Sequence, residues 1–193
     1  MTTIETKIKS FYQPDTDLAD IEHHVARQKG FWPKKRVMCS DAHTAQTFKQ
    51  LCHASSEVLE FQNAPDDINA LTDDGLTELA DVVIILLDLA GSYGWVVTPR
   101  YLRNPYGVNW ENFGVAPNEL NIDFVALGLF NRLAEIMQKL RKTGRVDFGD
   151  IAIREMFFMI NQYIAANSNG DIVDFVYEKT LKNMTRPNRY GVK

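Results

Sequence analysis

Apolar residues recur at a helical spacing along most of the chain, whereas the alternation typical of strands is scarce. This spacing predicts six helices, at about residues 17–29, 44–63, 75–92, 123–142, 148–167 and 171–184. Helix-ending residues support three of these bounds, since Gly30, Pro65 and Pro187 each follow a predicted helix. The pattern therefore predicts an all-α fold, built as a helical bundle.

The composition is that of an ordinary globular protein, with 45% hydrophobic and 24% charged residues. The most apolar stretch, residues 79–90, contains Asp81 and Asp88 and is too short to cross a bilayer, so we expect no membrane partner. The first ten residues lack the apolar core of a signal peptide. With only Cys39 and Cys52, a reducing cytoplasmic location is the simplest expectation. The net charge of −4 argues against stable nucleic-acid binding.

The distribution of charge is more informative than its sum. No Lys or Arg occurs between Lys49 and Arg100, and the same stretch carries nine acids: Glu57, Glu60, Asp66, Asp67, Asp73, Asp74, Glu78, Asp81 and Asp88. From Lys179 to the end the chain carries basic residues and no acid. The acidic stretch needs cations, and the basic tail offers a site for an anion.

Two acid pairs fall on predicted helices. Glu57 and Glu60 are three residues apart, as are Glu78 and Asp81, so each pair lies on one helical face. Two helices joined by a short connection pack antiparallel, which can bring both faces together. Carboxylates gathered in this way suit Mg²⁺ or Mn²⁺. The alternative is that they are the solvated faces of two ordinary helices, and the spacing alone leaves both readings open.

Other site chemistries fit the sequence less well. A di-iron bundle would need Glu-x-x-His motifs, and neither Glu57 nor Glu78 has His three residues later. The four histidines show no zinc-binding spacing, and His53, four residues before Glu57, is more typical of a helix-surface pair. No glycine-rich phosphate loop occurs, so side chains and metal would have to hold any phosphate.

Three motifs together resemble the MazG-like nucleoside triphosphate pyrophosphohydrolases. Glu57-Val-Leu-Glu60 and Glu78-Leu-Ala-Asp81 resemble the family's E-x-x-E and E-x-x-D pair. The tail that holds Lys179, Asn183, Arg186-Pro and Gly191 resembles its closing pattern. The segment Lys29-Gly-Phe-Trp32 resembles the stretch before the acidic helices in phage and bacterial members. Ser56 stands where some members carry a further Glu.

The resemblance implies a function and a set of site residues. Hydrolysis of a nucleoside triphosphate would give a monophosphate and pyrophosphate, with Mg²⁺, or Mn²⁺ in its place, bound by Glu57, Glu60, Glu78 and Asp81. Glu57 or Glu60 would orient the attacking water. Lys179, Asn183 and Arg186 would lie on one face of the last helix and bind the phosphates. Asp88, seven residues after Asp81, would contact sugar or metal, or else belong to a polar network.

Residues 96–170 depart from the short form of the family, so we expect a single domain over residues 1–193 with either an insertion or a diverged second half there. Aligned with the acidic helices, this segment places Glu135 on Glu57 and Glu155 on Asp81. The other two acids are replaced by Gln138 and Ala152. Because MazG-like proteins generally form oligomers of helical hairpins, the resemblance implies either a homo-oligomer or a tandem, pseudo-dimeric copy in one chain.

Two other functions stay open on the sequence. The first is a catalytically inactive helical regulator that binds nucleotides or a partner protein, against which the complete acidic and basic motifs argue. The second is a related hydrolase that acts on a nucleoside diphosphate or another nucleotide conjugate. No motif identifies the base or the sugar.

Overall fold

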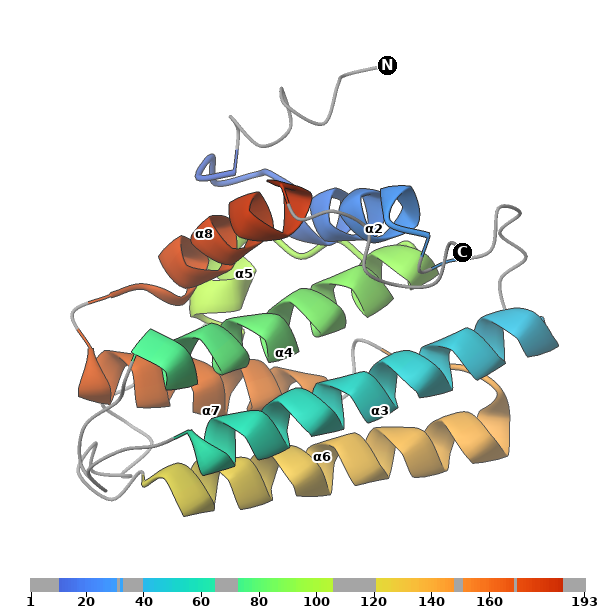
Figure 1. The fold of residues 1–193 in the computed structure, drawn as a ribbon. Coiled ribbons are helices and arrows are strands. Elements are labelled where there is room, and N and C mark those ends of the chain that lie inside the picture. Colours follow the sequence, from blue (N-terminus) through green and yellow to red (C-terminus); the bar gives the residue numbers. More distant parts are fainter. Residues whose placement is uncertain are drawn as a thin grey trace.

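The computed structural model describes residues 11–30, 32, 40–64, 73–105, 121–147, 151–168 and 170–185. These segments contain seven helices and no strand, which confirms the predicted all-α class. Figure 1 shows the helices, whose bounds are α2 Leu18–Gln28, α3 Asp41–Asn63, α4 Asp73–Tyr93, α5 Pro99–Arg103, α6 Ile122–Thr143, α7 Ile151–Asn167 and α8 Ile172–Thr185.

Helix α4 lies at the centre of the bundle. It packs against α2, α3, α7 and α8, and Figure 1 shows α2 and α8 on one side of it and α3 on the other. Most of its side chains are accordingly buried, among them Leu79, Val82, Val83, Leu86, Leu87 and Leu89. A helix surrounded in this way is apolar on nearly every face, so the polar residues of α4 stand out as exceptions.

The acidic helices α3 and α4 run in opposite directions, as Figure 1 shows. At one end, Gln50 Nε2 donates to Asp88 Oδ2 at 3.1 Å, and the hydroxyl groups of Thr47 and Tyr93 lie 3.2 Å apart. These pairs join the first half of α3 to the second half of α4. The second half of α3, with Glu57 and Glu60, therefore lies beside the first half of α4, with Glu78 and Asp81.

Helices α6 and α7 form a second hairpin, which packs on the first mainly through α3 and α6. Gln62 Nε2 donates to Asp123 Oδ1 at 3.1 Å, and Thr44 Oγ1 donates to the Gly144 carbonyl oxygen at 3.1 Å, so α3 and α6 are antiparallel. The residues that α6 buries follow a helical stripe: Val125, Ala126, Leu129, Leu133, Ile136 and Leu140.

The helix ends show which boundary signals operate. The side chains of Ser40 and Asn121 cap α3 and α6 by accepting from the backbone N–H three residues later, at 3.2 and 2.8 Å. Gly144 ends α6 with a φ of 70°, a left-handed conformation that favours glycine. The short helix α5 was not predicted. Within the described segments, no helix combines the length and the apolar character that a bilayer crossing requires.

Candidate functional site

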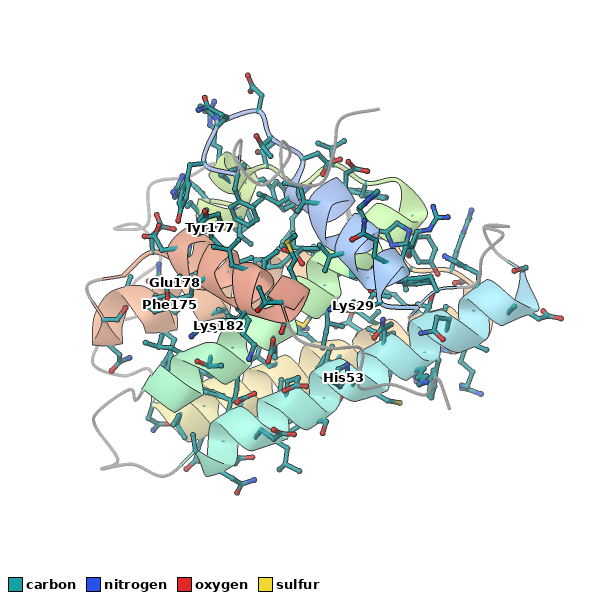
Figure 2. All side chains as sticks on the ribbon, turned by 45° about the horizontal axis from the view of Figure 1, so that its top comes forward. Lys29, His53, Phe175, Tyr177, Glu178 and Lys182 are labelled. Carbon is teal, nitrogen blue, oxygen red and sulfur yellow. The ribbon has the colours of Figure 1, made fainter. Side chains whose placement is uncertain are left out.

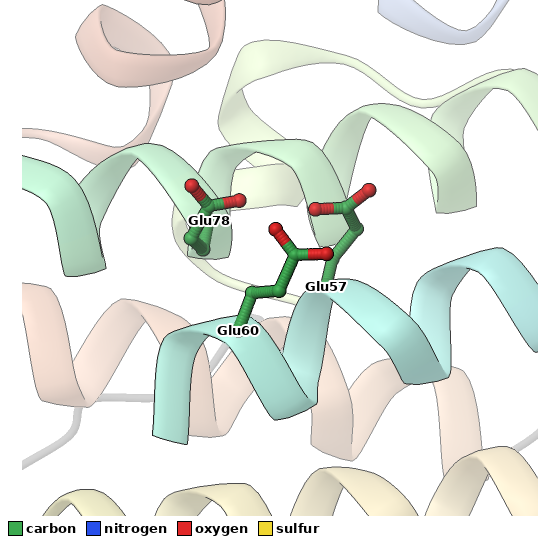
Figure 3. A group of neighbouring side chains, drawn as sticks. All are labelled: Glu57, Glu60 and Glu78. Atoms are coloured by element: carbon green, nitrogen blue, oxygen red, sulfur yellow. The ribbon is translucent and has the colours of Figure 1, made fainter. Parts of the chain in front are cut away.

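Three of the four predicted metal ligands lie together between α3 and α4. Glu57 and Glu60 project from α3 and Glu78 projects from α4, as Figure 3 shows. One carboxylate oxygen from each lies within 4.8 Å of the others. Glu57 is buried and Glu60 is exposed, so the group opens to solvent on one side. The donors are all carboxylate oxygens, the ligands that suit Mg²⁺ and Mn²⁺.

The fourth predicted ligand, Asp81, is held by α8. The Nζ atom of Lys179 lies 2.6 Å from Asp81 Oδ2, and the side chain of Asn183 also forms a hydrogen bond with Asp81. Burial raises the pKa of Asp81, while Lys179 and Asn183 act to lower it. Lys179 and Asn183 therefore share one face of α8, as predicted, and that face meets an acid in this structure.

A hydrogen bond links the carboxyl groups of Glu57 and Glu78 across the two helices. Burial and this hydrogen bond raise the pKa of Glu78 to about 7. Burial also acts to raise the pKa of Glu57, but hydrogen bonds from His53 and Glu78 outweigh it and leave that pKa below its usual value. As the pH falls below about 7, Glu78 takes up a proton, which relieves its repulsion from Glu57.

The side chain of His53 contacts this group of acids. Nε2 of His53 lies 2.8 Å from Glu57 Oε1, and its hydrogen bond to Glu57 raises the pKa of His53. Lys29, at the end of α2, donates to the Met184 carbonyl oxygen of α8 at 3.3 Å. Figure 2 labels Lys29, His53 and Lys182, which belong to α3 and to the ends of α2 and α8. Basic side chains of α3 and α8 therefore contact acids of the predicted site, His53 at Glu57 and Lys179 at Asp81.

Asp88 lies in a buried polar network near the other end of α4. Its carboxylate accepts from Trp32 Nε1 at 2.7 and 2.9 Å, and from Gln50 Nε2 at 3.1 Å. Nδ1 of His23 lies 2.8 Å from the same carboxylate. Burial raises the pKa of Asp88, against the opposing effect of His23 and Trp32. The structure thus agrees with the polar-network reading of Asp88, and its contact with a substrate stays a prediction.

The last predicted phosphate-binding residue, Arg186, lies outside the described residues, as does the Arg-Pro and Gly part of the tail motif. The sequence analysis had not singled out Glu22. This residue is fully buried between α2 and α8, where Thr180 Oγ1 donates to Glu22 Oε1 at 2.5 Å. Burial raises the pKa of Glu22 to about 8. Its position on the apolar face of α2, between Leu18, Ile21 and Val25, was a signal that could have identified it.

The acids of the second hairpin are bridged by an arginine. Arg132 of α6 lies 2.9 Å from Glu135 on the same helix and 2.5 Å from Glu155 on α7. Lys139 approaches Glu135 from the next turn, at 3.7 Å. The two acids that aligned with Glu57 and Asp81 therefore lie close to each other. Their shared cation is a side chain of the hairpin itself.

The chain has no significant match among family models, curated proteins or solved structures.

Proposed function

We propose that this protein is a nucleoside triphosphate pyrophosphohydrolase similar to the MazG-like enzymes, acting in the cytoplasm on free nucleotides. The observation that carries the proposal is the group formed by Glu57, Glu60 and Glu78, whose carboxylate oxygens lie within 4.8 Å of one another. Three carboxyl groups at this separation repel unless protons or a cation lie among them. The basic face of α8, which reaches Asp81 through Lys179, supports a substrate that carries both metal and negative charge.

Each residue has a distinct role in the proposed reaction. Glu57, Glu60, Glu78 and Asp81 would hold Mg²⁺, which would neutralise charge on the triphosphate and lower the pKa of a water. Glu57 or Glu60 would orient the attacking water toward the α-phosphorus. The bond from the α-phosphorus to the bridging oxygen then breaks, so that pyrophosphate leaves and the monophosphate keeps the oxygen of the water. Lys179 and Asn183, with Arg186 of the tail, bind the phosphate oxygens.

The proposal is tested with a panel of all common ribonucleoside and deoxyribonucleoside triphosphates and diphosphates in the presence of Mg²⁺. We expect at least one triphosphate to give its monophosphate and pyrophosphate. In water labelled with heavy oxygen, the label should enter the monophosphate, because attack at the α-phosphorus leaves the new oxygen there. EDTA should abolish turnover, and added Mg²⁺ or Mn²⁺ should restore it.

Other outcomes of the panel would replace the proposal. Orthophosphate as the first product, or label only in the pyrophosphate, would show attack at a different phosphorus. Turnover of diphosphates alone would identify the related hydrolase. Tight nucleotide binding with no turnover of any compound would identify a regulator that has kept the fold without the reaction.

A further inference from the structure

Lys179 occupies a position that is unusual for a lysine. Its side chain is buried, with the residue only 6% exposed, on the face of α8 that also buries Val176 and Thr180. Lysine is rarely buried unless its charge is paired. Here the partner is Asp81, which projects from α4 one turn after Glu78. The positive charge of Lys179 also acts to lower the pKa of Glu57 and of Glu78, so this ammonium group acts on acids of both α3 and α4.

This arrangement creates a conflict once the site holds metal and a triphosphate. The ammonium group of Lys179 already lies 2.6 Å from Asp81 Oδ2, so a cation at this carboxylate would lie close to a second positive charge. An ammonium group is a compact charge on a flexible stem, and it can turn from one anion to another without moving its helix. Helix α8 itself is fixed, since Thr180, the next residue, is tied to the buried Glu22 of α2.

We propose that Lys179 is an internal counter-ion that holds Asp81 in the metal-free protein and transfers to the phosphates when metal and triphosphate bind together. The inference rests on the proposed function. It means that Lys179 opposes binding of the metal alone and favours binding of the metal with a polyphosphate. The site consequently takes up its metal together with the anion.

The test measures Mn²⁺ binding to the purified full chain by electron paramagnetic resonance, with and without inorganic tripolyphosphate. Lys179→Met keeps the length of the side chain and removes its charge. Without tripolyphosphate, Mn²⁺ should bind Lys179→Met about tenfold more tightly than the wild type, given the strength of charge-assisted contacts. Tripolyphosphate should strengthen Mn²⁺ binding to the wild type. In Lys179→Met this strengthening should be at least about tenfold smaller, because no ammonium group can turn from Asp81 to the phosphates.

Lys182→Met is the matched control, because this lysine lies on the same helix, is exposed and forms no described contact with Asp81. It should change both quantities less than about twofold, as expected of a surface charge. Lys179→Gln guards against misfolding, since the amide can still donate to Asp81 without a charge. Its Mn²⁺ affinity should rise in the same direction as that of Lys179→Met.

The two ideas fail in different ways. If the wild type binds Mn²⁺ and neither Lys179 variant binds it more tightly, the counter-ion role is wrong while the metal site stands. If the wild type does not bind Mn²⁺ even with tripolyphosphate, the proposed function fails, and the counter-ion role fails with it. Equal effects of Lys182→Met and Lys179→Met would reduce the role of Lys179 to general surface charge and overturn the proposal.

Discussion

Both helical hairpins bring acidic side chains close together, but they differ in the positive charge that is paired with these acids. In the α3–α4 hairpin, Glu57, Glu60 and Glu78 approach one another, and neither helix carries a Lys or Arg other than Lys49, although His53 contacts Glu57. In the α6–α7 hairpin, Arg132 bridges Glu135 and Glu155 from within. Facing acids are therefore not enough to indicate a metal site. What distinguishes the first hairpin is that no arginine or lysine of its own is paired with these acids, so a permanent positive charge has to come from α8 or from solution.

The comparison also bears on the tandem arrangement. Each hairpin has two antiparallel helices, and they meet mainly through their first helices, α3 and α6. Such an arrangement is expected of two related halves, and the acid positions that aligned in the sequence occupy equivalent helices. We propose that the second hairpin supplies within one chain the packing partner that a second subunit would otherwise provide, and that only the first hairpin is a working site.

The largest expected effect is a difference in kcat between the same substitution in the first hairpin and in the second. Glu57→Gln should lower kcat at least about a hundredfold, because a metal ion contributes several kcal/mol to the transition state and about 1.4 kcal/mol is worth a factor of ten. Glu135→Gln, the same change at the aligned position, should leave kcat within about twofold, as expected away from the site. Pyrophosphate release under saturating substrate measures both. Comparable losses in the two variants would show that the second hairpin carries catalytic carboxylates.

Much of this comparison could be predicted from the sequence. The helix predicted at residues 123–142 is observed as Ile122–Thr143, because the apolar stripe and the end signals at Asn121 and Gly144 agree. The pairing of Glu57 and Glu60 with Glu78 followed from spacing and a short connection. Within one helix, local geometry determines which side chains share a face, and the sequence pattern is then sufficient.

The rest depends on contacts between distant segments. Lys179 and Asp81 are separated by most of the second half of the chain, and no local pattern shows that they meet. Arg132 and Glu135, three residues apart, look like an ordinary surface pair until α7 brings Glu155 to the same guanidinium. These two contacts decide which acids remain available to a metal, and both arise from packing that periodicity alone does not specify.

A second prediction compares how tightly the two halves are packed. A Cβ added at Gly91 of α4 would collide with the backbone oxygen of Ala19 and lie 2.6 Å from the Cβ of His23. At Gly128 of α6 it would meet the Met159 side chain, at 2.6 Å from Sδ. Backbone cannot yield, whereas a methionine can adopt another rotamer.

Gly91→Ala should therefore lower the free energy of unfolding by about 1–3 kcal/mol through overpacking. Gly128→Ala should stay within about 1 kcal/mol of wild type, because alanine's helix propensity offsets the displacement of Met159. Urea denaturation followed by circular dichroism measures both. Equal destabilisation would mean that the α6–α7 packing is as rigid as the contact between α2 and α4.

The smallest expected effect concerns Arg132, which pairs with the acids of the second hairpin. Arg132→Met keeps much of the apolar stem and removes the charge, leaving Glu135 and Glu155 to repel each other. The two ion pairs are about one-third to two-fifths exposed, so each contributes modestly. We expect a loss of about 1 kcal/mol in unfolding free energy at low salt. In about 1 M salt, where screening is nearly complete, the difference should largely disappear.

The same variant also tests why the second hairpin has no metal site of its own. If the missing ligands are decisive, Arg132→Met should bind no more Mn²⁺ per chain than the wild type, because Gln138 and Ala152 stand where Glu60 and Glu78 stand in the first hairpin. If Arg132 alone excludes the metal, its removal should add a second Mn²⁺ equivalent in a titration. Adding Glu135→Gln and Glu155→Gln to Arg132→Met removes the repulsion and should recover the lost stability. If stability recovers while the number of Mn²⁺ ions bound per chain stays the same, Arg132 takes the place of a metal ion whose ligands this hairpin has lost.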